Sequence, residues 1–410
     1  MQTKSPHCIP EVVVINTELP GRRGRDLLSH NSGFEHPKLP AFSFENTMGN
    51  IVSLAANVHL TRRYPVSIVH FVTHRCNARC SFCFIDFDDP NTFRNELTVE
   101  EIDRITTSLG PSLQNVNLTG GEPFARKELI DIARCYFRNT QIRSLFITSN
   151  GSLPDRIEKF LATLTEEFSD RKIIFSFSID GFPEDHDRIR KIEGLFENTM
   201  KSYHQVRRFS QNAQANISIT VSHDNYATAP NIYDALIEKY GVRSLTVGVV
   251  RDEGVYRIPM EHKRAIHATY SALIGRLLAD MKSGRLEGYD RGSLQGRLMN
   301  KKNALVYSIV RDQYMEPHYI SPCRAGSLFG IINADGVVRP CEILDRPLGN
   351  LRDYDYDFMR LWQDKTAQET RTWIRKTNCH CTYECAWSFN ILSTLRYQPA
   401  LVAAALGKDV

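Results

Sequence analysis

Residues 66–83 read VSIVHFVTHRCNARCSFC and decide the fold of this chain. The first seven residues are mostly apolar or β-branched, which is typical of a buried strand. The loop that follows places Cys76, Cys80 and Cys83 in the spacing Cys-x3-Cys-x2-Cys. Cysteine thiolates hold iron–sulfur clusters, and three thiolates on a four-iron cluster leave one iron open to bind another molecule. The stretch therefore predicts a cluster that activates a ligand at the end of a strand.

The bulk composition indicates an ordinary globular protein. The chain has 410 residues, of which 42% are hydrophobic and 24% charged, enough for two or three domains. The net charge is only +4, and the one basic cluster is Arg22, Arg23 and Arg25, so we expect no nucleic-acid partner. No apolar run approaches the roughly 20 residues of a membrane span, so we expect no membrane partner and a cytoplasmic location.

Cysteine usage favours metal or catalytic roles over disulfides. The chain has 10 cysteines and shows no secretion signal, and the cytosol keeps thiols reduced. Eight of them fall into two groups, 76–83 and 323–385. We assign Cys8 no role. Cys135 lies in an apolar helical pattern and is expected to be a small buried hydrophobic residue.

Between residues 66 and 251, short β-rich runs alternate with amphipathic helical stretches, as in βα units around a parallel sheet. The expected strands are 66–72, 115–119, 143–148, 173–179, 216–221 and 244–250. The expected helices are one capped by Thr98 with Glu101 in a capping box, then 126–138, 154–168 and 231–239. Six such units predict a partial (β/α)6 barrel with its site at the carboxyl ends of the strands.

The remaining segments complete the expected domain organisation. Residues 1–62 are expected to form an irregular extension with at most one strand, at 12–15, and residues 63–255 the barrel. A helical connector should follow at 256–316, with helices over 261–282 and 294–314. A hairpin turning at Asp335-Gly336 should open a small α+β iron–sulfur domain over 317–398, before a tail at 399–410.

Polar turns follow three of the expected strands. Residues 119–123 read TGGEP, where two glycines let the backbone approach a ligand and Glu122 can accept hydrogen bonds from an ammonium group. The third strand ends in TSNG (148–151) and the fourth in SIDG (178–181). Each of these stretches is an ordinary turn when taken alone.

The loop of Cys76, Cys80 and Cys83, with Phe82 in the aromatic position, resembles the signature of the radical S-adenosylmethionine (SAM) superfamily. In that family SAM chelates the open iron of a [4Fe-4S] cluster, and one electron splits it to give a 5′-deoxyadenosyl radical that abstracts hydrogen from a substrate. The TGGEP stretch resembles the motif that holds the methionine amino group. The resemblance also implies that Ser178 lies near the ribose and that Arg190 faces the cofactor carboxylate, although a solvated helix start explains Arg190 equally well. The implied cofactor-binding residues are Phe82, Gly120, Gly121, Glu122, Pro123, Asn150, Ser178, Asp180 and Arg190.

The C-terminal cysteines resemble the Twitch or SPASM domains that bind auxiliary iron–sulfur clusters. The candidate ligands are Cys323, Cys341, Cys379, Cys381 and Cys385. Five cysteines suffice for one auxiliary [4Fe-4S] cluster and not for two fully ligated ones. The pair at 379 and 381 is closer in sequence than the family's usual pair, which leaves the ligand set open. Cys323, Cys341 and Cys385 are favoured, with the fourth place undecided.

Zinc is the alternative for both cysteine groups. Zinc sites prefer four Cys or His ligands in two short-spaced pairs, which the N-terminal trio fits poorly even if His74 completed it. A zinc ribbon is the corresponding alternative for the C-terminal group.

The resemblance implies a radical enzyme, and two substrate classes compete. We favour oxidation or rearrangement of a small polar metabolite, because the first 62 residues do not look like a leader-binding domain. The alternatives are radical modification of a ribosomally made peptide and a non-catalytic iron–sulfur carrier. A reductase or flavodoxin-type protein is expected to donate electrons. No catalytic acid or base can be chosen from the sequence, because its position relative to a substrate must be known.

Overall fold

The computed structural model describes residues 52–209, 211–253 and 258–408. The extension over 1–51 lies outside these ranges, with the strand expected at 12–15, the basic cluster at 22–25 and Cys8. Residues 52–61 are helical and end in the π-helical turn η1 (Asn57–Thr61), whereas an irregular extension was expected up to residue 62. Leu54 and Val58 of this segment pack against the hydrophobic cluster that contains the C-terminal cysteines, which explains why the segment is helical and not irregular.

Six parallel strands form the core of the molecule, as expected. They are β1 (Ser67–Thr73), β2 (Asn115–Gly120), β3 (Ser144–Ser149), β4 (Lys172–Ser178), β5 (Ala213–Val221) and β6 (Leu245–Val249), and each is paired with the next. All seven residues of β1 are buried, as its apolar sequence predicted. The strands therefore form the open, partial barrel that the alternating pattern indicated, with their carboxyl ends along one edge.

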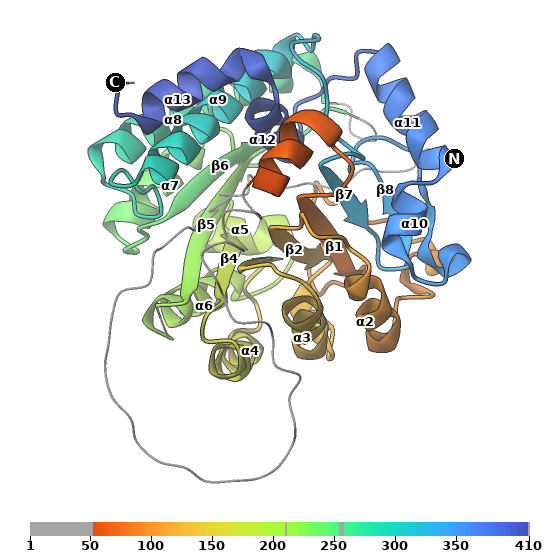
Figure 1. Ribbon diagram of the computed structural model, residues 1–410. Coiled ribbons are helices and arrows are strands. Elements are labelled where there is room, and N and C mark those ends of the chain that lie inside the picture. Colours follow the sequence, from red (N-terminus) through yellow and green to blue (C-terminus); the bar gives the residue numbers. More distant parts are fainter. Residues whose placement is uncertain (1–51, 210, 254–257, 409–410) are drawn as a thin grey trace, which may run out of the picture.

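Helices cover the outside of this sheet (Figure 1). Between β1 and β6 the chain forms α2 (Val99–Thr107), α3 (Leu129–Asn139), α4 (Pro154–Glu167), α5 (Pro183–Arg190), α6 (Leu195–Phe209) and α7 (Ala229–Glu238), with 3-10 turns η2 (Pro90–Phe93) and η3 (Pro123–Ala125). Of these, α2, α3, α4 and α6 lie on the outside of the sheet. Helix α2 begins with the expected capping box, because Thr98 accepts a hydrogen bond from the N–H of Glu101 and the Glu101 carboxylate accepts one from the N–H of Thr98. Helices α5 and α6 were not predicted, and in α5 the charged stretch at 183–191 hid the apolar spacing.

The C-terminal hairpin joins the barrel sheet. Strands β7 (Phe329–Ile332) and β8 (Val337–Arg339) are antiparallel around the expected turn, and β9 (Gly349–Asn350) pairs with β8. Strand β7 also pairs in parallel with β1, so that one sheet of nine strands runs in the order β6-β5-β4-β3-β2-β1-β7-β8-β9. The auxiliary segment is thus attached to the strand that leads into Cys76.

Two long helices separate the barrel from this hairpin, as predicted. They are α8 (Met260–Ser283) and α9 (Leu294–Met315). The C-terminal region adds η4 (Leu351–Tyr354), α10 (Phe358–Trp362), α11 (Lys365–Lys376), α12 (Glu384–Ser393), η5 (Leu395–Tyr397) and α13 (Gln398–Ala405). Figure 1 shows α8, α9 and α13 grouped on one side of the sheet and α10 and α11 near β7 and β8. No helix in the described part of the chain has both the length and the apolar composition that crossing a bilayer requires.

Candidate active site and auxiliary cysteine cluster

The first cysteine loop leaves the carboxyl end of β1 and docks onto the end of α5. The N–H of Arg79 donates to the carbonyl of Arg190 (3.0 Å), and the N–H of Ser81 donates to the carbonyl of Ile189 (3.3 Å). The Ser81 hydroxyl also hydrogen-bonds the Asp224 carboxylate, beyond β5. The loop that carries the three cysteines is therefore held by the end of α5 and by the residues that follow β5.

The glycines of TGGEP let the backbone approach another part of the chain, whereas the sequence predicted that they let it approach a ligand. A Cβ on Gly120 would collide with the carbonyl oxygen of Thr73, and a Cβ on Gly121 with that of Arg75. The N–H of Gly121 donates to Thr73 O and the N–H of Glu122 to Arg75 O, both at 2.9 Å. The glycines thus let the TGGEP turn pack against the backbone that enters the cysteine loop, and Pro123, also buried, continues this turn.

Glu122 is completely buried and organises the same turn. Its Oε1 accepts hydrogen bonds from the N–H of Phe124 (3.0 Å) and the hydroxyl of Ser149 (2.9 Å), and its Oε2 accepts one from the N–H of Asn150 (2.7 Å). Burial raises the pKa of Glu122, and these hydrogen bonds oppose that shift. A carboxylate has about four acceptor positions, so one remains for an ammonium group.

Asn150 connects this turn to the cysteine loop. Its side-chain amide donates to Asn77 Oδ1 (2.9 Å), and Asn77 is the neighbour of Cys76. Asn77 in turn donates to the hydroxyl of Ser152 (2.9 Å). The predicted residues at the ends of β2 and β3 therefore converge on the first cysteine, and Asn77 is a contact that the sequence had not indicated.

Asp180 and Arg190 form a buried ion pair beside the second cysteine. Asp180 Oδ2 accepts from Arg190 Nε (2.9 Å) and Nη2 (2.7 Å), and its Oδ1 accepts from the N–H of Thr220 (2.9 Å). Arg190 Nη1 lies 3.9 Å from Cys80 Sγ. Although burial lowers it, the Asp180 carboxylate raises the pKa of Arg190 overall. Arg190 is therefore a buried cation at the cysteine loop, which corrects the alternative of a solvated helix start.

The two remaining predicted residues lie at the same edge of the sheet. Ser178 is buried at the end of β4, and Phe82 is buried within the cysteine loop. The Arg190 guanidinium carbon lies 5.8 Å from the centre of the Phe82 ring. The ends of β2, β3 and β4, the cysteine loop after β1 and the end of α5 thus supply the predicted cofactor-binding residues.

The three N-terminal cysteines are partly buried, and their thiols influence one another. Burial, followed by the charge of Glu122, raises the pKa of Cys76 to about 12, with smaller effects from Cys80 and Cys83. Burial also raises the pKa of Cys83 to about 11. The N–H of Ala78 points at Cys76 Sγ (3.3 Å), a donor that favours a bound thiolate. These features fit thiols that lose their protons to a metal cluster.

The C-terminal cysteines come together in a second hydrophobic cluster. Cys341 and Cys385 are buried there, and Cys323, Cys379 and Cys381 are partly buried against it. Backbone N–H groups again point at sulfur, from Leu344 to Cys341 (3.4 Å) and from Tyr383 to Cys381 (3.5 Å). All five candidate ligands thus belong to one hydrophobic cluster, and thiols are the ligands that iron–sulfur clusters require.

Charge interactions link four of these five thiols. Burial, then the charges of Cys379 and Cys341, raises the pKa of Cys323. Burial also raises the pKa of Cys341 to about 11. Burial raises the pKa of Cys381 too, and the charges of Cys323 and Cys341 raise it further. Within the described ranges, no three His, Cys, Asp or Glu side chains are placed as ligands of a single metal ion.

A group of buried charges, which the sequence had not indicated, joins the barrel to the auxiliary cysteines. Arg251 follows β6, and its Nη1 and Nη2 lie 3.2 Å from Glu342 Oε2 and 3.8 Å from Glu384 Oε2. Burial raises the pKa of Glu384 to about 7, against the effect of Arg251. The available signal was the position of the two glutamates next to Cys341 and Cys385.

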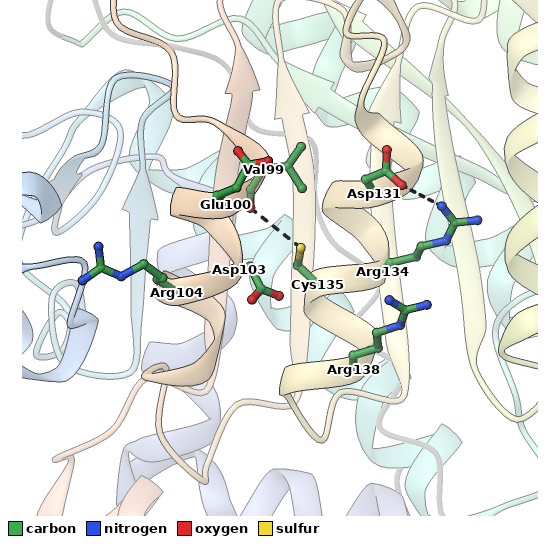
Figure 2. Close-up of a pocket in the computed structure, with 8 residues that line it drawn as sticks. All are labelled: Val99, Glu100, Asp103, Arg104, Asp131, Arg134, Cys135 and Arg138. Carbon is green, nitrogen blue, oxygen red and sulfur yellow. Dashed lines mark hydrogen bonds and ion pairs between the residues drawn. The ribbon is translucent and has the colours of Figure 1, made fainter. Parts of the chain in front are cut away.

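A surface groove lies elsewhere, between α2 and α3 (Figure 2). It has a volume of about 490 Å³, and charged side chains of both signs line it. Cys135 is buried beside it, with Sγ 4.0 Å from the carbonyl oxygen of Val99, as expected for a small core residue. None of the residues that line the groove is a predicted site residue.

The family comparisons match this geometry. The profile of the radical SAM superfamily matches residues 71–236, and that of an iron-sulfur cluster-binding domain, SPASM, matches residues 323–386. These ranges contain the two cysteine groups and the strand ends described above.

Curated relatives share part of their length with this chain. The Fe-coproporphyrin III synthase of Methanosarcina barkeri is 29% identical over 42% of this chain and 41% of its own length. The sporulation killing factor maturation protein SkfB of Bacillus subtilis is 25% identical over 70% of this chain and 62% of its own length. The AdoMet-dependent heme synthase of M. barkeri is 27% identical over 73% of this chain and 82% of its own length. The chain thus spans less than two thirds of the first two relatives.

Solved structures share the fold. A structure of anSMEcpe with bound AdoMet aligns with a TM-score of 0.55 at 18% identity, covering 84% of this chain and 96% of that one. Streptococcus suis SuiB bound to its precursor peptide SuiA aligns with a TM-score of 0.54 at 17% identity, covering 80% of this chain and 71% of SuiB. At these identities the likeness concerns the fold alone.

Proposed function

The chain belongs to the radical SAM superfamily and carries a SPASM-type iron–sulfur domain, and on this premise we propose that it abstracts hydrogen from a small polar metabolite, which it oxidises or rearranges. It is a radical enzyme with a SAM-binding [4Fe-4S] cluster and an auxiliary iron–sulfur centre. When bound, SAM and its cluster supply the carbon-centred radical that removes the hydrogen atom. The protein's own residues bind and orient these groups.

One observation carries the assignment of the SAM site: three thiols, a buried carboxylate and a buried guanidinium meet at the carboxyl edge of the sheet. Cys76, Cys80 and Cys83 would hold the cluster. Glu122 has an acceptor position for the amino group of SAM, and Arg190 offers positive charge for its carboxylate. Phe82, Gly120, Gly121, Pro123, Asn150, Ser178 and Asp180 complete the proposed cofactor site.

The second cysteine group supports an oxidative outcome. Arg251 leaves the carboxyl end of β6 and contacts glutamates that neighbour Cys341 and Cys385. The auxiliary segments therefore contact the carboxyl end of β6, and their cysteine cluster also packs against Val66, at the amino end of β1. A cluster held there by the C-terminal cysteines could accept the electron that a substrate radical releases, and a reductase or flavodoxin-type protein would supply the electron for SAM cleavage.

The substrate class is the finer part of the proposal. The heme synthase, which this chain covers most fully among the relatives named above, makes a small molecule according to its name. A peptide substrate is the second candidate, favoured by the similarity to SkfB and by the precursor peptide bound in the SuiB structure.

Formation of 5′-deoxyadenosine tests the enzyme class. Anaerobically reconstituted protein, reduced with dithionite and given SAM, should release 5′-deoxyadenosine, and the Cys83→Ser variant should not. A non-catalytic iron–sulfur carrier releases none with either protein, and that result would contradict the proposal.

Peptide binding tests the substrate class. Precursor-like peptides encoded beside the gene would be titrated into the full-length holoenzyme by calorimetry. We expect no tight binding. Binding with a dissociation constant in the micromolar range or below, with increased 5′-deoxyadenosine formation, would replace the metabolite with a peptide.

A further inference from the structure

Arg251 is a buried cation between the barrel and the auxiliary cysteines. It lies two residues beyond β6, and 3% of its surface is exposed. Its guanidinium carbon lies 4.5 Å from the centre of the Tyr383 ring, and its terminal nitrogens face Glu342 and Glu384. Every one of these partners belongs to the auxiliary segment, so Arg251 reaches across from one part of the protein to the other.

The partners of Arg251 are neighbours of candidate cluster ligands. Glu342 directly follows Cys341, and Glu384 directly precedes Cys385. These two cysteines come from different elements, the hairpin loop after β8 and helix α12. One guanidinium group therefore connects both halves of the auxiliary-cluster scaffold to the barrel.

A second contact from the same loop strengthens this connection. The Glu253 carboxylate accepts hydrogen bonds from the N–H and the hydroxyl of Thr382, each at 2.8 Å. Thr382 directly follows Cys381. The short segment 251–253 thus contacts chain neighbours of three of the five auxiliary cysteines.

The charge balance around Arg251 is unequal. Glu342 and Glu384 are both buried, and Arg251 is the cation that faces the two of them. A buried carboxylate without a cation is strongly unfavourable, and the potential of an iron–sulfur cluster depends on the charge around it. Loss of the guanidinium would remove a positive charge that faces two buried acidic side chains beside the cluster ligands.

We propose that Arg251 is the positioning residue of the auxiliary cluster: it fixes the cysteine segments against the end of the barrel and sets the charge next to that cluster. The inference deepens the proposed function and rests on it in one respect, that the C-terminal cysteines hold a redox-active cluster. The role is distinct from SAM binding, because Glu342, Tyr383 and Glu384, which contact Arg251, belong to the auxiliary segment.

The test compares Arg251→Met with Arg251→Lys in the full-length, anaerobically reconstituted protein. The midpoint potential of the auxiliary cluster would be followed by electron paramagnetic resonance (EPR) during a redox titration without SAM. We expect Arg251→Met to shift this potential to more negative values or to lose the auxiliary signal, because loss of a positive charge next to the cluster disfavours its reduction. Arg251→Lys should restore most of the wild-type value.

Two further variants make the test specific. Arg352→Met is the matched control, since Arg352 pairs with Glu101 of α2 (2.9 Å) and so also joins barrel and auxiliary segments, but away from the cysteines. It should leave the potential unchanged even if it lowers the melting temperature. Glu342→Gln removes one negative charge and should shift the potential in the opposite direction to Arg251→Met.

Failure of the inference and failure of the proposed function can be told apart. Equal auxiliary potentials in wild type, Arg251→Met and Glu342→Gln would overturn the role of Arg251. If Arg251→Met does not fold, Arg251→Lys and Glu342→Gln decide the question. SAM cleavage, measured as 5′-deoxyadenosine formation, should persist in Arg251→Lys and Arg352→Met, and its absence from the wild type would contradict the proposed function instead.

Discussion

The Glu122 carboxylate orders a turn, and we propose that it also binds the amino group of SAM. The change Glu122→Gln replaces an acceptor oxygen with an NH2 group that faces other donors, the N–H groups of Phe124 and Asn150 or the Ser149 hydroxyl. An unsatisfied buried donor costs about 1–3 kcal/mol, so we expect a loss of stability of this size and at least tenfold weaker SAM binding. Thermal unfolding and calorimetric SAM titration measure the two effects.

A stability loss without any change in SAM affinity would restrict Glu122 to the structural role. Glu128→Gln is a suitable control, because Glu128 is half exposed and pairs only loosely with Arg126, at 3.6 Å. It should alter stability by less than about 1 kcal/mol.

Gly121 supplies a second prediction for a single residue. The methyl group of Gly121→Ala would collide with the Arg75 carbonyl, and the turn would have to move away from the cysteine loop. We expect reduced iron loading of the N-terminal cluster, measured as iron per protein after reconstitution.

Gly275→Ala is the matched control for that change. Gly275 lies inside α8, and a Cβ there meets nothing within 4 Å. This variant should be more stable by about 0.5–1 kcal/mol, because alanine favours a helix over glycine. Normal iron loading of Gly121→Ala would refute the explanation of the double glycine as a close-packing feature.

At the scale of the elements, strand β1 and helix α5 each contain a buried histidine that stays uncharged. His70 of β1 is fully buried and hydrogen-bonds the Tyr136 hydroxyl at 2.8 Å, and burial lowers its pKa to about 3. Burial lowers the pKa of His186 of α5 well below its ordinary value. Because the unfolded chain takes up these protons near pH 6.5 and the folded chain does not, stability should fall as the pH falls below that value.

The expected loss between pH 7.5 and 5.5 is about 1.4 kcal/mol per histidine. Urea unfolding at both pH values measures the total, and His70→Gln should lower the pH dependence by one histidine's share. An unchanged pH dependence in His70→Gln would show that His70 takes up its proton in the folded protein as well.

The strands and the site loops could be predicted from the sequence because their signals are local. Each of the six parallel strands is a run of five to nine residues that contains several apolar or β-branched residues, and each polar turn follows its strand directly. The parallel pairing of β7 with β1 could not be predicted, since it depends on contacts between residues more than 250 positions apart. Helix α5 was hidden because five of its eight residues are charged.

The candidate site shows the same division. The cysteines, Glu122 and Arg190 carry motif signals and were found. Arg251 carries none, because its role arises only when the end of β6 meets a loop about 90 residues later in the chain, where Glu342 lies 91 positions away. Contacts between distant segments are set by tertiary packing, which no local pattern records.

At the scale of the whole molecule, two cysteine groups sit on one continuous sheet and should load separately. Cys341→Ser should lose the auxiliary cluster and keep the N-terminal one, so that its iron content falls by about half while SAM still perturbs the remaining signal. Cys83→Ser should behave in the opposite way. Iron analysis and Mössbauer spectroscopy measure both. Zinc in place of iron at the C-terminal group would instead identify a zinc ribbon.

The most direct test of the central claim is the EPR spectrum of the dithionite-reduced Cys341→Ser protein with and without SAM. This variant leaves the N-terminal cluster as the source of the signal. The account predicts that SAM changes the g values, because it binds the iron that Cys76, Cys80 and Cys83 leave open. A spectrum that is identical with and without saturating SAM would contradict it.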